Sequence, residues 1–362
     1  MLNSISTFKI RLCQIVIFGF VFIGCSSTSE LFRESTIADP PDKDYSIIYY
    51  IHADSDYLYH DSDGNQVNGN SQVLHSAHKV GEGAKTGEVF IFYQRPFKKF
   101  LGLFPRNSSQ MYHYVNGELT NVVIYRHSDR DEEFLTTEAE LHRHYRTPGQ
   151  NSDQKVHFLY YGHEIPIEGG QKYHRTLPEV EVTIETFSKG IEKFLISDRQ
   201  RFDLVVLSTC NNGSPAMAEN LLPITDIVLA SPQNLHLSHI DSESLRYLET
   251  APELQSFQLA RDMAEKTFNR LESEIMTAIT ITVYDFEAVR EYRDELLTFK
   301  DAYDNLNYRS FYTDNMDCNE VEFFDTGRFS NGVKTWYKPA RFGRRSLTEA
   351  HSGWGCRPLI QN

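Results

Sequence analysis

Val156-His157-Phe158-Leu159-Tyr160-Tyr161-Gly162-His163 is a short apolar run that ends in glycine and one reactive side chain. Phe202-Asp203-Leu204-Val205-Val206-Leu207-Ser208-Thr209-Cys210 repeats this pattern. Apolar runs of this length are typical of parallel strands that are buried on both faces. Open α/β sheets place their chemistry at the carboxyl ends of such strands. The two runs therefore predict that His163 and Cys210 stand side by side at one rim of a sheet.

Strands and helices alternate around these two runs, which predicts a mainly parallel sheet with helices on both faces. A two-residue Asn116-Gly117 turn favours a hairpin between its flanking segments. The predicted strands are 45–51, 88–93, 112–115, 122–125 and 227–230, and the predicted helices are 71–79, 135–145 and 184–196.

The pattern changes after Pro252. Helical periods at 254–271 and 287–303 flank an apolar strand at 278–284, so we expect a C-terminal α+β extension packed on the core. The expected organisation is a signal peptide at 1–24, a tether at 25–42, the catalytic core at 43–250 and the extension at 251–362.

The composition is that of a protein able to fold as a globule. The chain has 362 residues, 40% of them hydrophobic and 24% charged, with a formal net charge of −14. A nucleic-acid partner requires a basic footprint, which this charge excludes. We expect a monomer.

The amino-terminal segment has the features of an export signal. Lys9 and Arg11 precede an apolar run from Leu12 to Ile23, and Gly24 and Cys25 follow. This arrangement resembles the cleavage motif of bacterial lipoproteins, in which the new amino-terminal cysteine carries acyl chains that anchor it to a membrane. Ser26 in place of aspartate favours the outer membrane by the same resemblance. The alternative is an ordinary cleaved signal that happens to contain cysteine.

Three cysteines remain after the predicted lipidation site: Cys210, Cys318 and Cys356. A cell-envelope location permits disulfides, and three thiols leave one unpaired. Either Cys318 pairs with Cys356 and Cys210 stays free, or all three are isolated and buried.

A free thiol beside an imidazole is the combination needed for nucleophilic catalysis at neutral pH. Small and turn-forming residues surround Cys210, and backbone N–H groups at such a turn are able to hold an oxyanion. The competing interpretation is an inert buried cysteine and a structural histidine. The matched strand-end contexts favour catalysis.

The order strand–His163, helix, strand–Cys210, helix, strand resembles the caspase-like clan of cysteine peptidases, and specifically the clostripain family. The strand at 45–51, the segment Ile227-Val228-Leu229-Ala230-Ser231-Pro232 and the passage 280–289 resemble further parts of that family, from about residue 45 to about residue 300. The resemblance implies a caspase-like fold and a peptidase that acts on proteins or peptides. It also implies that His163 is the general base and acid, Cys210 the nucleophile, and the N–H groups of Glu164 and Cys210 the oxyanion hole.

Two positions depart from the family pattern. Glu164 replaces the usual glycine after the histidine, and Ser208 replaces an aspartate that helps to bind basic substrate side chains. Ser208 is therefore a predicted pocket residue, with Asp241 or Glu164 as candidates for the acidic group. Members are often calcium-dependent and self-cleaving, which implies calcium near Asp54 and Asp56 and a cleavage loop containing Lys172 and Arg175; ordinary solvated charge is the other interpretation of that loop.

Three histidine pairs have spacings typical of metal ligands: His75/His78, His142/His144 and His236/His239. Zinc requires three or four converging ligands, and no pair supplies them alone. We therefore expect surface histidines and no metal site.

The sequence thus predicts a lipid-anchored cysteine endopeptidase of the cell envelope. The rival from another class is a non-catalytic binding lipoprotein on the same scaffold, and Glu164 and Ser208 are the residues that favour it.

Overall fold

The computed structural model describes the following residues: 43–53, 57–60, 64–95, 98–100, 104–106, 109–127, 133–147, 154–169, 173, 180–197, 200–235, 240–309, 317–318, 321–343 and 350–356. Several predictions lie outside them: the signal, the tether and Cys25, the calcium candidates Asp54 and Asp56, and the loop residues Lys172 and Arg175.

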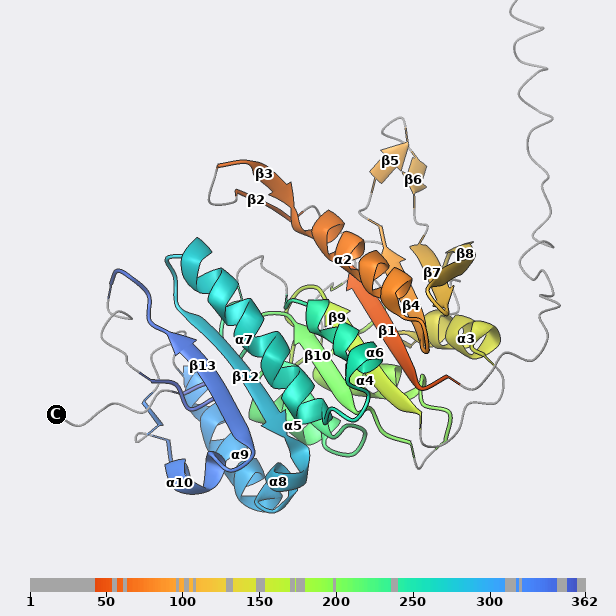
Figure 1. The fold of residues 1–362 in the computed structure, drawn as a ribbon. Coiled ribbons are helices and arrows are strands. Elements are labelled where there is room, and N and C mark those ends of the chain that lie inside the picture. Colours follow the sequence, from red (N-terminus) through yellow and green to blue (C-terminus); the bar gives the residue numbers. More distant parts are fainter. Residues whose placement is uncertain are drawn as a thin grey trace, which may run out of the picture. The chain divides into compact units, whose positions relative to one another are not determined.

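One sheet organises the described part of the chain, where nine strands run in the order β13-β12-β11-β10-β9-β1-β4-β7-β8. The stretch from β11 to β4 is parallel, and antiparallel strands border it on both sides (Figure 1). The strands are β1 (Tyr45–His52), β4 (Glu88–Gln94), β7 (Ser109–Val115), β8 (Glu118–Tyr125), β9 (Lys155–Tyr161), β10 (Leu204–Ser208), β11 (Ile227–Ala230), β12 (Ile279–Asp285) and β13 (Val333–Lys338). Two short hairpins, β2 (Leu58–His60) with β3 (Gln66–Asn68) and β5 (Lys98–Phe100) with β6 (Phe104–Arg106), lie outside this sheet.

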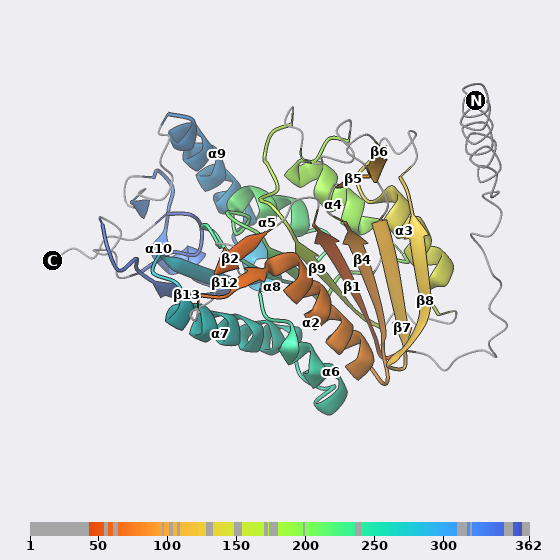
Figure 2. The same ribbon diagram turned by 90° about the horizontal axis from the view of Figure 1, so that it is seen from above.

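Helices cover both faces of the sheet (Figure 2). One face carries α3 (Thr136–Tyr145), α4 (Ile184–Glu192), α5 (Pro215–Leu221) and α9 (Arg293–Arg309). The other carries α2 (Gly69–Gly83), the 3-10 helix η1 (Glu243–Arg246), α6 (Tyr247–Thr250) and α7 (Ser256–Glu274). The short helices α8 (Phe286–Arg290) and α10 (Thr326–Phe329) lie near the β12–β13 edge. None of the helices in the described segments combines the length and hydropathy that crossing a bilayer requires.

Two apolar layers hold this arrangement together, one on each face of the sheet. All eight residues of β1 are buried, and they alternate between the layers: Ile48 and Tyr50 join one, Ile47 and Tyr49 the other. Burying a side chain of this size stabilises the fold by about 1.5–3 kcal/mol. This double burial explains why the central strands are apolar without alternation.

The fold class expected from the sequence is confirmed: a mainly parallel α/β sheet covered on both faces. The Asn116-Gly117 turn also forms as expected, with φ of 55° and 78°, the positive values that such a hairpin turn requires. The predicted helix at 287–303 is wrong in one respect, because a turn at Glu291 and Tyr292 divides it into α8 and α9. The sequence analysis missed β13, which extends the sheet beyond β12.

Asp203 joins β9 and β10 at their amino-terminal ends. Its carboxylate accepts a hydrogen bond from the Val156 N–H at 2.8 Å, and its own N–H donates to the Val156 carbonyl at 2.9 Å. Burial raises the pKa of Asp203 to about 6, against the opposing effect of the Val156 N–H.

We predict that Asp203 makes stability fall with rising pH. The pKa of Asp203 is about 6 in the folded chain, above the ordinary value of 3.8 for an aspartate, so the folded state binds more protons than the unfolded state around and between these two values. The free energy of unfolding therefore falls by about 2 kcal/mol from pH 4 to pH 7 through this group. Denaturant unfolding of Asp203→Asn should lack this component. Parallel pH profiles for wild type and variant would contradict the prediction.

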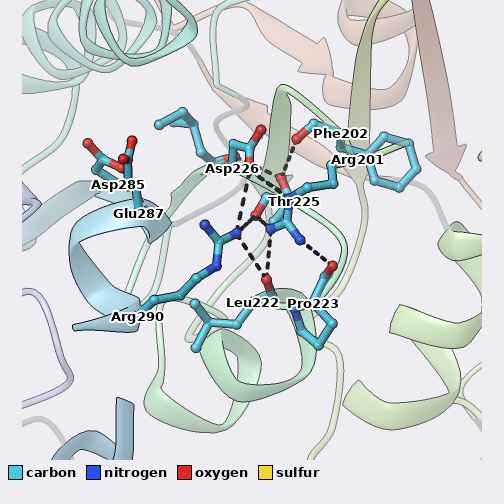
Figure 3. Close-up of polar contacts among 10 residues, drawn as sticks. Arg201, Phe202, Leu222, Pro223, Thr225, Asp226, Asp285, Glu287 and Arg290 are labelled. Carbon is cyan, nitrogen blue, oxygen red and sulfur yellow. Dashed lines mark hydrogen bonds and ion pairs between the residues drawn. The ribbon is translucent and has the colours of Figure 1, made fainter. Parts of the chain in front are cut away.

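Two arginines meet at the residues that follow α5, and one of them connects α8 to this point (Figure 3). Arg201 donates to the Asp226 carboxylate at 2.7 Å and to the Leu222 carbonyl at 2.8 Å. Arg290, from α8, reaches the same Leu222 carbonyl and the Thr225 carbonyl, each at 3.2 Å. The guanidinium groups thus satisfy carbonyls that the end of a helix leaves without partners.

Tyr284 connects a downstream segment to the loop that follows Cys210. Its buried hydroxyl donates to the Gly213 carbonyl at 3.1 Å and also hydrogen-bonds to the Gly353 carbonyl. The Tyr284 ring packs against Trp354, with ring centroids 4.8 Å apart, and the Trp354 indole donates to the Phe329 carbonyl at 2.9 Å.

A disulfide joins Cys318 to Cys356 and closes this downstream segment. Both cysteines are fully buried, and Cys210 is not part of a disulfide. Of the two alternatives that the sequence leaves open, the structure shows the Cys318–Cys356 pair and not three isolated thiols.

Candidate active site

The pairing of β9 with β10 brings the two predicted catalytic residues to one rim. The strands are parallel neighbours, and their register places Ser208 opposite Tyr161. The Gly162 N–H continues the pairing with a bond to the Ser208 carbonyl at 3.4 Å. His163 and Cys210 each follow this last matched pair by two positions, so the two residues leave the sheet at adjacent strand ends.

Cys210 lies at the start of a tightly held loop. The residue is partly exposed, and Asn211 after it adopts a left-handed conformation with φ of 56°. The Asn211 N–H donates to the Gln233 carbonyl at 3.0 Å, and the Gly213 N–H donates to the Ser231 carbonyl at 2.8 Å. The loop therefore follows the end of β11 closely while the Cys210 side chain keeps contact with solvent.

The loops that follow β9 and β10 each contain a glycine that packs closely against another part of the chain. A Cβ on Gly213 would lie 2.6 Å from the Tyr284 hydroxyl and 2.7 Å from the Pro232 backbone nitrogen. A Cβ on Gly162 would lie 2.9 Å from the Tyr160 hydroxyl. Both positions depend on the missing side chain of glycine.

Aromatic rings lie beside His163, whose side chain is exposed to solvent on its other side. The Tyr57 ring lies 4.9 Å from the His163 ring, and the His52 ring lies 6.3 Å away, centroid to centroid. The Tyr173 hydroxyl donates to the backbone carbonyl of His163 at 2.9 Å and lies 2.5 Å from the Tyr160 hydroxyl. Burial raises the pKa of Tyr160 well above its usual range, so the phenol keeps its proton in this network.

Asn212 joins the loop after His163 to the loop after Cys210. Its amide oxygen accepts from the Ile165 N–H and its amide nitrogen donates to the Ile165 carbonyl, both at 2.9 Å. The Thr209 hydroxyl donates to the same amide oxygen at 2.6 Å. Asn212 and Ile165 are buried, so this bridge fixes the spacing of the two loops.

Glu164 follows His163 and turns its carboxylate toward the other loop. The exposed carboxylate accepts a hydrogen bond from the Asn211 side-chain amide at 2.7 Å. The residue that replaces the family's glycine therefore forms a second link between the loops.

The two predicted pocket residues have different surroundings. Ser208 lines a cavity of about 20 Å³ at the rim, and its hydroxyl accepts the Ile240 N–H at 2.9 Å. The Asp241 carboxylate pairs with the Arg270 guanidinium at 2.9 Å and lines a second cavity of about 430 Å³, between α2 and η1. The described residues lining the first cavity do not include Asp241.

The histidine pairs do not all lie on the surface as expected. His142 is buried, and burial lowers its pKa to about 3, so the imidazole is neutral. The expectation is wrong for this residue because His142 packs against Phe90, with ring centroids 4.6 Å apart. His236 and His239 lie outside the described residues. Among the residues described, no group of three or more histidine, cysteine, aspartate or glutamate side chains is arranged to hold a metal ion.

The sequence analysis missed the residues that support the rim: Asn212, Tyr57, Tyr173 and His52. A signal existed for Asn212 alone, since an asparagine just after a strand end is a frequent turn residue whose side chain hydrogen-bonds to backbone groups. The aromatic residues come from distant segments and meet His163 only through the fold.

Comparisons with known proteins identify the fold. No family model and no curated protein matches the chain. Among solved structures, the inactive zymogen of a C11 protease from Parabacteroides distasonis is similar, with a TM-score of 0.56, 13% identity and coverage of 83% of this chain and 85% of that one. The secreted C11 cysteine protease "iotapain" from Bacteroides thetaiotaomicron is similar too, with a TM-score of 0.52, 14% identity and coverage of 82% and 88%. The likeness confirms the resemblance to clostripain-type, or C11, proteases at the level of the fold.

We predict that Asn212→Ala lowers the free energy of unfolding by about 2–4 kcal/mol, because it removes three hydrogen bonds and leaves the Ile165 N–H and carbonyl buried without partners. Denaturant unfolding measures the change. The matched control is Asn211→Gly, which removes the contact with Glu164 and suits the positive φ; it should change stability by less than about 1 kcal/mol. Equal losses of unfolding free energy in the two variants would show that the Asn212 hydrogen bonds do not stabilise the fold more than the Asn211 contact does.

Proposed function

We propose that this chain is a cysteine endopeptidase in which Cys210 is the nucleophile and His163 the general base and acid. The register of β9 and β10 carries the proposal, because it delivers an imidazole and a partly exposed thiol to neighbouring strand ends. The fold shared with C11 proteases supports it.

The reaction follows from these two groups. His163 takes the proton of the Cys210 thiol, and the sulfur attacks the carbonyl carbon of the peptide bond. The oxyanion that forms accepts hydrogen bonds from the backbone N–H groups of Cys210 and Glu164. The bond to nitrogen breaks, and His163 gives its proton to the leaving amine.

Water completes the cycle. His163 removes a proton from a water molecule, whose oxygen attacks the acyl-enzyme thioester. The thioester bond breaks, the peptide acid leaves, and the sulfur recovers the proton. No step in this scheme requires a metal; a calcium ion belongs to the proposal only as an implication of the family resemblance.

A non-catalytic binding protein on the same scaffold is the second candidate. Glu164 favours it, since its carboxylate is held beside the Cys210 loop by Asn211 and adds negative charge near a thiolate. Dependence of Cys210 labelling on His163 separates the two candidates.

The proposal predicts that a library of peptidyl ketones labels Cys210 in a reaction that depends on His163. Intact-mass measurement should show one adduct on the wild type, none on Cys210→Ala, and labelling at least about 100-fold slower on His163→Ala, since a positioned base contributes about 10²–10⁴-fold. The control His75→Ala removes an exposed histidine of α2 and should label at the wild-type rate. Equal rates for His163→Ala and wild type would favour the binding protein.

We further propose that the chain is a monomeric lipoprotein of a bacterial cell envelope and that it lies at the outer membrane. Acyl chains on Cys25 form its anchor, and residues 26–42 are the tether. The support is the sequence of the signal segment, and a secreted protein stands among the similar structures. Stable anchoring requires more than one acyl chain.

Expression of the full chain in a bacterium that processes lipoproteins tests the anchor. We expect the wild type to sediment with membranes and its amino-terminal peptide to carry an acyl mass, while Cys25→Ser is recovered without that mass. A wild-type chain cleaved at another site and free of lipid would show that the signal is an ordinary one.

A further inference from the structure

His52 is a second histidine at the rim, and its side chain is fully buried. It is the last residue of β1, the strand that pairs with β9 on the side away from β10. The register places Ile51 opposite Tyr161, so His52 lies beside Gly162, and a Cβ on Gly162 would lie 3.0 Å from the His52 Cβ. The buried histidine therefore packs against the main chain that leads to His163.

A chain of three hydrogen bonds connects His52 to the main chain of His163. The His52 Nδ1 lies 3.3 Å from the Tyr160 hydroxyl, which lies 2.5 Å from the Tyr173 hydroxyl. The Tyr173 hydroxyl in turn contacts the His163 carbonyl at 2.9 Å. The chain thus runs from a buried imidazole to the loop that carries the exposed one.

The number of protons fixes the direction of these bonds. A carbonyl only accepts, so the single proton of the Tyr173 hydroxyl is donated to His163. The Tyr160 hydroxyl must then donate to the Tyr173 oxygen, and the Tyr160 oxygen accepts from the His52 Nδ1–H. Bonds that all point the same way polarise and strengthen one another. His52 is therefore the first donor of a chain that ends on His163.

Ring contacts give the members of this chain a fixed orientation. The Tyr173 ring stacks on the His52 ring, with centroids 4.9 Å apart and an interplanar angle of 25°. The His52 ring meets the His163 ring edge to face, at an interplanar angle of 78°. Tyr50 stacks on Tyr160 with centroids 5.7 Å apart. These contacts hold the donors in place whether or not a substrate is bound.

We propose that His52 is a positioning residue for the peptidase reaction: through Tyr160 and Tyr173 it holds the main chain of His163, and so keeps that imidazole in reach of the Cys210 thiol. The inference rests on the proposed peptidase function. It requires no contact between His52 and the substrate, because the effect of His52 is carried by His163. A displacement of 1 Å in a catalytic group costs about 10²-fold in rate.

The test follows adduct formation on Cys210 with the peptidyl ketone that labels the wild type fastest, over a range of reagent concentrations. His52→Phe keeps an aromatic ring but lacks the Nδ1–H, and Tyr173→Phe keeps the ring but lacks the bond to His163. We expect each variant to lower the rate at saturating reagent by at least about 10-fold and to leave the half-saturating concentration unchanged. Tyr173 is only partly buried, so its variant serves even where His52→Phe does not fold.

Two outcomes of this measurement would overturn the positioning role and leave the peptidase function intact. One is a wild-type rate in either folded variant. The other is a raised half-saturating concentration with an unchanged saturating rate, which would assign His52 to the binding of the reagent. Labelling of His163→Ala at the wild-type rate would instead overturn the peptidase function itself.

A rescue variant and a control sharpen the comparison. His52→Asn carries an amide N–H near the place of the imidazole Nδ1–H, and we expect it to label at least about 3-fold faster than His52→Phe. The control Tyr112→Phe removes a tyrosine hydroxyl of β7 that donates to Gln110 at 2.8 Å, and it should label at the wild-type rate. A rate for His52→Asn as low as that of His52→Phe would show that the Nδ1–H is not what His52 contributes.

The same substitution in the His163→Ala background separates positioning from a general effect on the fold. Without the imidazole of His163 there is no base for His52 to position. His52→Phe should therefore leave the residual labelling rate of His163→Ala unchanged. A further loss as large as the one in the wild-type background would show that His52 supports the Cys210 loop or the fold as a whole, and would overturn the proposal.

Discussion

The parallel pairing of β9 with β10 is the constraint on which the rest of the structure depends. Two segments distant in sequence enter the sheet side by side, and the register that begins at Asp203 and Val156 is kept to the rim. A shift of one residue would turn every side chain of β10 to the opposite apolar layer. The burial of both strands therefore fixes where a thiol and an imidazole emerge.

The rim adds rigidity that the strands alone do not provide. Asn212 and Glu164 connect the loop of one strand to the loop of the other, and Tyr173 holds the main chain of His163. These contacts are made by backbone groups, or by residues adjacent in sequence to His163 and Cys210. Such an arrangement leaves His163 exposed and Cys210 partly exposed while their main chain stays in place, which a preorganised site requires.

The sequence predicts the central strands well because burial on both faces leaves apolar runs that few other structures produce. The strand ends, and with them His163 and Cys210, follow from the same runs. Edge strands were harder to predict. Strand β13 is only half buried and lies among polar and glycine-rich residues, so its sequence lacks a clear hydrophobic period. The pairing of Asp241 with Arg270 and the burial of His142 arise from contacts between distant helices and strands, which local pattern does not encode.

Tyr284 and residues 350–356 give the rim a dependence on a distant part of the chain. The Tyr284 hydroxyl hydrogen-bonds to the carbonyls of both Gly213 and Gly353. The Cys318–Cys356 disulfide ties down the segment that contains Gly353. During synthesis, the turn after Cys210 is made long before the segment that supports it. The loop thus acquires its final backing only after the downstream segment has been made and its disulfide has formed.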